Sequence, residues 1–174
     1  MRKLTIILSL LSLSIIMTAQ DKVGDLIALA DVPESIALVA QAESYANAVQ
    51  SNDYDKVAEM THADVLAMGG GKDFIIADLK AEGDQLQKQG FSYKGTEVGN
   101  HPEFLKANEE LQTIIPVKYY LSFNSKDVEA WTNLFAVSAD EGVTWKFVNL
   151  DKFDEPSLRE FVSNVSTELI YPNN

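Results

Sequence analysis

The chain has 174 residues, with 26 acidic side chains against 14 basic ones, a net charge of −12 and no cysteine. This length suits one domain, and the absence of cysteine excludes disulfides and a lipid-attachment cysteine, so an apolar core alone must stabilise the fold. A surface this acidic repels phosphate backbones and anionic lipid head groups, so neither nucleic acid nor a membrane surface is an expected partner.

Residues 1–19 are predicted to be a secretory signal peptide. Arg2 and Lys3 form a basic start, and residues 4–17 form an apolar run shorter than the roughly 20 residues that a spanning helix needs. Cleavage is expected after Ala19, where a small residue precedes an abrupt polar change; the alternative is an uncleaved N-terminal anchor. Cleavage removes two basic and no acidic side chains, so the mature chain has a net charge of −14. A cleaved signal peptide predicts a periplasmic or secreted protein without a membrane anchor.

Residues 20–33 are expected to be a lead-in segment before a single domain of residues 34–174. The first helix is predicted to begin at Asp31, which caps it in a capping box with Glu34, and to end near residues 51–52. Its apolar side chains recur at helical spacing and predict one buried stripe, formed by Leu38, Ala42, Tyr45 and Val49.

Asp53 is predicted to cap a shorter second helix, whose apolar side chains are Val57 and Met60. Residues 61–71 end in a glycine triplet and are predicted to form an irregular loop. A third helix is expected over residues 72–89, with Gly90 as its C-terminal cap. Gly83 weakens this helix by roughly 1 kcal/mol relative to alanine, and close packing against a neighbouring element is the reason we expect for it.

From residue 91 the hydrophobic period changes from helical to alternating, which predicts strands. Residues 91–98 form the first strand, residues 99–102 a turn, residues 103–107 a short strand, and residues 110–121 a long one. In the first strand, one predicted face holds Phe91, Tyr93 and Gly95, and the other holds Ser92, Lys94, Thr96 and Val98. In the long strand, the predicted buried face holds Leu111, Thr113, Ile115, Val117, Tyr119 and Leu121. Pro116 removes a ladder donor there, which predicts an edge position or a bulge.

Residues 127–138 and 143–150 are predicted to complete an antiparallel sheet, before Asp154 caps a short helix over residues 155–162. The strand over 127–138 is apolar on both faces. Either Trp131, Phe135 and Val137 point inward, or Val128, Leu134 and Ala136 do. A sheet that helices cover on one face only needs no second apolar face. We therefore expect a partner subunit to cover the outer face in a homodimer.

The order of these elements resembles the nuclear-transport-factor-2-like and SnoaL-like superfamily. The segments SNDYDKVAEMTHADVLAMGGGKDFI (residues 51–75) and VSADEGVTWKFVNLD (residues 137–151) are similar to those of small bacterial exported members without assigned activity. The resemblance implies an α+β fold in which a cone-shaped, curved, mixed or antiparallel sheet wraps around a long helix. It also implies a cavity at the wide end and dimerisation through the outer sheet face.

Enzymes of this superfamily set polar groups in an apolar cavity. The limonene epoxide hydrolase type needs an arginine between two aspartates, and this mechanism is not expected because Arg159 is the only arginine after residue 19. An isomerase or cyclase needs a carboxylate base and an oxyanion donor. No spacing singles out one pair among the available groups, which are Asp64, Glu97, Glu129, Tyr45, Tyr93 and Tyr119.

His62 is the most suggestive single residue, as a general base oriented by Asp64; a histidine that caps a short helix is the alternative. His101 falls in a predicted turn, and the glycine-rich residues 69–72 lack the spacing of a phosphate loop. Two distant histidines without cysteine predict no metal site, and no cofactor is expected. The side chains expected to line a cavity are His62, Asp64, Tyr93, Tyr119, Trp131 and Trp145.

These observations predict an exported, non-enzymatic module that binds a small apolar ligand or pairs with a protein. The alternative is a SnoaL-type isomerase, cyclase or dehydratase that acts on a small apolar ligand with a carboxylate or His62 as general base. A third possibility is an obligate dimer with a scaffolding role and a filled core.

Overall fold

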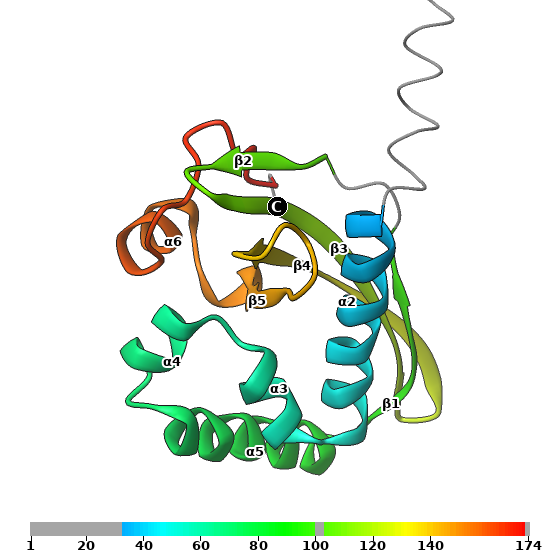
Figure 1. Ribbon diagram of the computed structural model, residues 1–174. Helices are drawn as coiled ribbons and strands as arrows, with labels where there is room; N and C mark the ends of the chain where they lie inside the picture. The colour runs from blue at the N-terminus through cyan, green and yellow to red at the C-terminus, as the bar shows by residue number, and fades with distance from the viewer. Residues whose placement is uncertain (1–32, 100–102, 173–174) are drawn as a thin grey trace, which may run out of the picture.

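A computed structural model describes residues 33–99 and 103–172 (Figure 1). The signal peptide, the capping role of Asp31 and the turn at residues 100–102 lie outside the described residues. The described chain has α+β architecture, with helices packed against one five-stranded antiparallel sheet that is not closed into a barrel. Within the described ranges, no helix is long and apolar enough to cross a membrane.

The first three predicted helices are present with nearly the predicted bounds. They are α2 (Pro33–Ser51), α3 (Tyr54–Met60) and α5 (Lys72–Lys88). The predicted stripe of α2 packs on the sheet, except that Val49 is only half-buried. Asp53 caps α3, as predicted, by accepting a 3.2 Å hydrogen bond from the backbone N–H of Lys56.

The loop predicted over residues 61–71 is wrong in its first half, where α4 (Ala63–Met68) forms. His62 caps this helix, because its Nδ1 accepts a hydrogen bond from the backbone N–H of Asp64 at 3.2 Å. Residues 63–68 include no glycine or proline, so nothing in them opposes a helix once it is capped. The irregular part is confined to the glycines that follow, where Gly70 and Gly71 adopt φ angles of 86° and 103°.

The sheet has the strand order β1-β3-β4-β5, with β2 paired to one end of β3. Its strands are β1 (Phe91–Val98), β2 (Leu105–Ala107), β3 (Glu110–Phe123), β4 (Lys126–Ser138) and β5 (Lys146–Asn149). A 3-10 turn, η1 (Leu150–Lys152), and the short helix α6 (Glu155–Phe161) follow. Asp154 caps α6 as predicted, accepting from the backbone N–H of Ser157 at 2.9 Å.

The predicted face assignment in β1 is wrong beyond Tyr93, because a register irregularity between Tyr93 and Gly95 shifts the alternation. Thr96 lies opposite Tyr119, and Val98 lies opposite Val117, so both point to the inner face. Val98 is therefore buried on the same side as Tyr93, and Gly95 is on the other.

The prediction that Pro116 marks an edge strand or a bulge in β3 is also wrong, because β3 pairs with β1 on one side and continuously with β4 on the other. The Pro116 carbonyl accepts a 2.8 Å hydrogen bond from Gly99, just where the pairing with β1 ends. In an antiparallel strand the N–H and C=O of one residue point to the same neighbour. The backbone N–H that Pro116 lacks would therefore point into the gap between β1 and β2, so the proline removes no hydrogen bond between β3 and β4.

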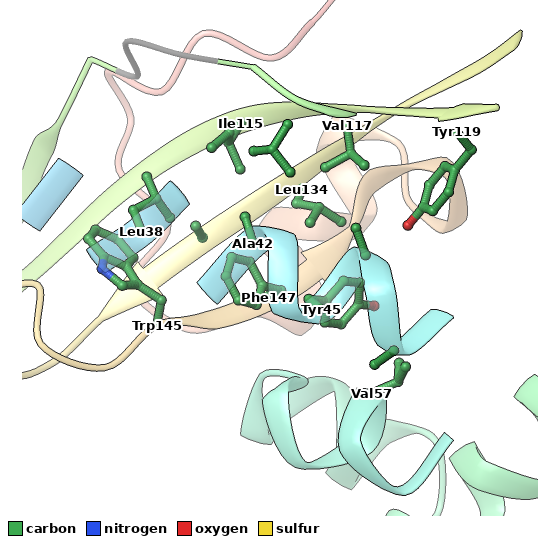
Figure 2. Packing of buried hydrophobic residues seen from close by; sticks show 14 residues of the cluster. Leu38, Ala42, Tyr45, Val57, Ile115, Val117, Tyr119, Leu134, Trp145 and Phe147 are labelled. Atoms are coloured by element: carbon green, nitrogen blue, oxygen red, sulfur yellow. The ribbon is translucent and has the colours of Figure 1, made fainter. Parts of the chain in front are cut away.

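The two faces of β4 are buried by different parts of the same chain. On the inner face, Leu134 and Ala136 pack with α2, β3 and β5 in the inner cluster (Figure 2), whose largest side chains are Leu38, Tyr45, Ile115, Val117, Tyr119, Trp145 and Phe147. On the outer face, Phe135 and Val137 pack with α6 and the C-terminal segment in the outer cluster, with Val148, Leu150, Leu158, Val162 and Leu169. Of the two alternatives, Leu134 and Ala136 point inward.

The premise that a partner must cover this outer face is therefore wrong for Phe135 and Val137. The chain itself supplies that cover through α6, which lies on the opposite side of β4 and β5 from α2 (Figure 1). Among the described residues, no other part of the chain covers the opposite end of the outer face. There Trp131 is 61% exposed, and Lys118 lies over its ring at 5.1 Å from the centroid.

Candidate ligand cavity

A cavity of about 680 Å³ lies under α5, and its lining runs from the inner face of the sheet past the part of β4 that β5 does not pair with, to Trp131 and Val148 of the outer face and to α6. The side chains that line it are mostly apolar or aromatic. They include Tyr45, Val49, Val57, Val65, Met68, Ile75, Leu79, Leu86, Tyr93, Tyr119, Leu121, Ala130, Trp131, Phe147, Phe153 and Phe161. This combination of volume and lining is typical of small-molecule sites, whose volumes are about 300–1,000 Å³.

The cavity exists because α5 does not pack tightly on the sheet. None of the residues of α5 is buried, although Ile75 and Leu79 face inward and are half-buried. Gly83 lets α5 approach Tyr54 closely, because a Cβ at this position would lie 2.0 Å from the Tyr54 hydroxyl oxygen. Glycines with positive φ bound α5 at both ends, at Gly71 and Gly90, where a residue with a side chain would be strained.

Three tyrosines contribute hydroxyl groups to the inner wall, beside the buried Thr61 and Thr132. Burial raises the pKa of Tyr45 to about 12, opposed by a hydrogen bond with Thr61. Burial also raises the pKa of Tyr119, with smaller contributions from Tyr45, Tyr93 and the negative charge of Asp151. The Tyr93 and Tyr119 rings meet edge to face, with centroids 5.5 Å apart. All three hydroxyls therefore stay protonated and neutral near pH 7 and remain hydrogen-bond donors.

The solvent side of the cavity is acidic. Asp78 and Glu82 come from α5, and Asp151 and Lys152 come from η1. Lys152 forms an ion pair with Glu82 and so connects η1 to α5 across the opening. Both partners are largely exposed, so this pair contributes about 1 kcal/mol or less to stability.

A second cavity of about 700 Å³ adjoins the first one under the C-terminal half of α5. Both cavities are lined by Leu86, Tyr93 and Leu121. Polar groups from the end of α2, the turn that follows it, the start of α3 and α5 complete the second cavity, among them Gln50, Asn52, Tyr54, Lys80, Asp84 and Gln87. The space under α5 thus continues from an apolar part into a polar one, with Tyr93 at the boundary.

The six side chains expected at a cavity divide into two groups. Tyr93, Tyr119 and Trp131 line the apolar cavity. Trp145 is 1% exposed and belongs to the core, where it stacks on Phe104 and its indole N–H donates to the Gly142 carbonyl at 2.9 Å. His62 and Asp64 do not line the cavity.

His62 and Asp64 instead fix the ends of α4 and α6. The carboxylate of Asp64 accepts hydrogen bonds from the Ser163 hydroxyl at 2.6 Å and from the Ser163 backbone N–H at 2.8 Å, which together lower the pKa of Asp64. Burial lowers the pKa of His62, against the opposing charges of Asp64 and Glu110. In neutral His62, Nδ1 carries no proton and accepts a hydrogen bond from the backbone N–H of Asp64. His62 Nδ1 and the Asp64 carboxylate, 3.9 Å apart, therefore form no ion pair at neutral pH.

The other carboxylates weighed as bases lie on the outer sheet face. Glu97 accepts from the Tyr120 hydroxyl at 2.5 Å, and Glu129 pairs with Lys118 at 2.7 Å. Sequence reasoning missed the acidic groups of the cavity, which are Asp78, Glu82 and Asp151. They follow no motif and become neighbours only through the packing of α5 over η1. Among the described residues, no group of three histidine, aspartate or glutamate side chains is placed to hold a metal ion.

No protein-family model matches the chain, and neither the curated proteins nor the solved structures contain a match to it.

Proposed function

We propose that this chain is an exported, non-enzymatic module of the nuclear-transport-factor-2-like type, whose sheet forms a cone and binds a small apolar ligand under α5. The 680 Å³ cavity is the observation that carries the proposal. A binding role fits its walls, because the deep polar groups are neutral side chains, chiefly tyrosine and threonine hydroxyls, and the carboxylates stand at the exposed side. The signal peptide predicted from residues 1–19 supports a periplasmic or secreted location.

A neutral fluorescent probe tests this proposal. N-phenyl-1-naphthylamine should bind the purified chain with enhanced fluorescence, because it is apolar and carries no charge for the acidic chain to attract or repel. Ala130→Phe places an aromatic ring in the cavity and should weaken binding about tenfold or more, whereas Ala81→Phe, on the exposed side of α5, should not. Equal probe affinity in the two variants, at matched unfolding midpoints, would contradict a site in this cavity.

A SnoaL-type isomerase, cyclase or dehydratase is the second candidate. Its supporting observation is that the charge of Asp151 acts on the Tyr119 hydroxyl, so a carboxylate and a neutral donor are within electrostatic reach of each other. His62 does not line the cavity, so the base would be Asp78 or Asp151. Conversion of a β,γ-unsaturated ketone to its conjugated isomer should then disappear in Asp151→Asn or Asp78→Asn and persist in His62→Ala. No turnover by the parent chain would leave only the binding role.

Pairing with a second copy through the open end of the outer sheet face is the protein-interaction part of the proposal. Trp131 is the exposed aromatic side chain there, beside Lys118 and Tyr120. Sedimentation equilibrium should show a dimer that Trp131→Glu weakens and Val143→Glu, at another exposed apolar position, does not. A parent chain that is monomeric at all accessible concentrations would contradict this pairing.

A further inference from the structure

The exposed side of the cavity carries two carboxylates without a cationic partner among the described residues. Lys152 is the one basic side chain of the lining, and its ion pair is with Glu82. Neither Asp78 nor Asp151 takes part in an ion pair within residues 33–99 and 103–172. Three acids against one base leave the lining with a net charge of −2. An anionic ligand would enter against this charge, and a cationic one would be attracted.

A tyrosine hydroxyl faces the same space. Tyr119 is 8% exposed and lines the cavity, and no hydrogen bond of its hydroxyl is observed within the described residues. Figure 2 shows the Tyr119 and Tyr45 hydroxyls at the same end of the inner cluster, away from Trp145. A tyrosine hydroxyl accepts as well as donates, so it suits a ligand group that brings an N–H donor or a positive charge.

Aromatic rings provide a third feature of the same kind. Tyr93 and Tyr119 meet edge to face in the cavity wall, and Trp131 stands at the rim. Ring faces attract amine and quaternary ammonium groups, and they do so more strongly where water is partly excluded. The apolar side chains of Ile75, Leu79 and Phe161 offer a surface for the uncharged remainder of such a ligand.

We propose that the ligand is an amphiphilic cation, whose apolar body lies under α5 and whose amine or quaternary ammonium group is held by Asp78, Asp151 and Tyr119. This inference rests on the proposed binding function and specifies its ligand class. Anionic amphiphiles of the same length are discriminated against. Lys152 does not offset this preference, since Glu82 already neutralises it.

Competition against N-phenyl-1-naphthylamine measures the charge preference directly. Three competitors share one alkyl chain and differ in the head group: decyltrimethylammonium, decanol and decyl sulfate, all used below micelle-forming concentrations. We expect the cation to displace the probe at about tenfold lower concentration than the alcohol, with the sulfate weaker than both. Added salt should reduce the difference, because the carboxylates are exposed.

The double variant Asp78→Asn/Asp151→Asn assigns the preference to the site. It should bring the cation to within about twofold of the alcohol and leave the alcohol unchanged. A matched control, Glu43→Gln/Glu109→Gln, removes two exposed acids that do not line the cavity and should keep the preference. Tyr119→Phe should weaken the cation more than the alcohol.

The outcomes separate the two proposals. Probe binding without a preference for the cation, or with a preference for the sulfate, overturns the ligand class and leaves the cavity as a binding site. An equal loss of preference in the control variant assigns it to the overall charge and overturns the site. No probe binding by the parent chain overturns the binding function itself.

Discussion

Replacing Gly83 by alanine tests how Tyr54 positions α5. In a helix interior, alanine is favoured over glycine by about 1 kcal/mol. Here, however, the new Cβ would lie 2.0 Å from the Tyr54 hydroxyl oxygen, which donates to the Asn52 Oδ1 at 2.7 Å. The ring must move and release this hydrogen bond, at a cost of about 1 kcal/mol. The two terms offset each other, so Gly83→Ala should leave the free energy of unfolding nearly unchanged.

The same substitution should stabilise a chain that carries Tyr54→Phe. Without the hydroxyl, the nearest ring atom is the Tyr54 Cζ, 3.2 Å from the new Cβ, a contact that a shift of a few tenths of an ångström relieves. Gly83→Ala should then add about 1 kcal/mol, giving a coupling energy of about 1 kcal/mol in the double-mutant cycle. Urea unfolding followed by the fluorescence of the buried Trp145 measures all four chains. Equal stabilisation in both backgrounds would refute the proposed contact.

Three further substitutions test other parts of the structure. The lowered pKa of Asp64 implies a contribution to stability that is present above the usual pKa of 3.8 and lost as the pH falls. Asp64→Asn should therefore lower the free energy of unfolding by about 1 kcal/mol at pH 7, measured by urea unfolding, and should reduce the loss of stability between about pH 5 and pH 3. Leu158→Ala empties a fully buried position of the outer cluster and should cost about 2–4 kcal/mol by the same measurement; a cost below that of an exposed site would show that α6 does not cover the sheet. Tyr119→Phe should change the unfolding free energy by less than about 0.5 kcal/mol, because the hydroxyl lines the cavity and no hydrogen bond to it is observed within the described residues; a larger loss would reveal one.

Local signals sufficed where one pattern determines one element. The stripe of α2 and the side-chain cap of α3 depend on residues a few positions apart, and both were predictable. The alternation along β3 also predicts its buried face, because a strand of 14 residues repeats the pattern often enough to be unambiguous. The sequence also predicts that Gly83, a glycine in a helix interior, allows close packing against a neighbouring element, and that neighbour is Tyr54.

Other features depend on pairings that no local pattern encodes. The irregularity after Tyr93 shifts Thr96 and Val98 to the inner face, yet the sequence alternates there without a break. The cover of Phe135 comes from α6, across more than twenty residues of chain, so two-sided hydrophobicity alone could not distinguish it from a partner subunit. The carboxylates of the cavity come together only because α5 packs over η1. In the sequence, the acidic residues of α5 look like those of any solvated helix face.

The burial along β4 explains why the cavity lies where it does. From Leu134 to Ser138 every residue is buried, because α2 covers one face and α6 the other. In the first half of the strand, Thr132 is buried but Ala130 is only half-buried and Trp131 is exposed, and these three residues line the cavity. The doubly covered half fixes the strand, so the other half can border open space without the sheet losing its core. A ligand in the cavity would contact the half of β4 that folding leaves unpacked, and its binding would require little rearrangement of the inner or outer cluster.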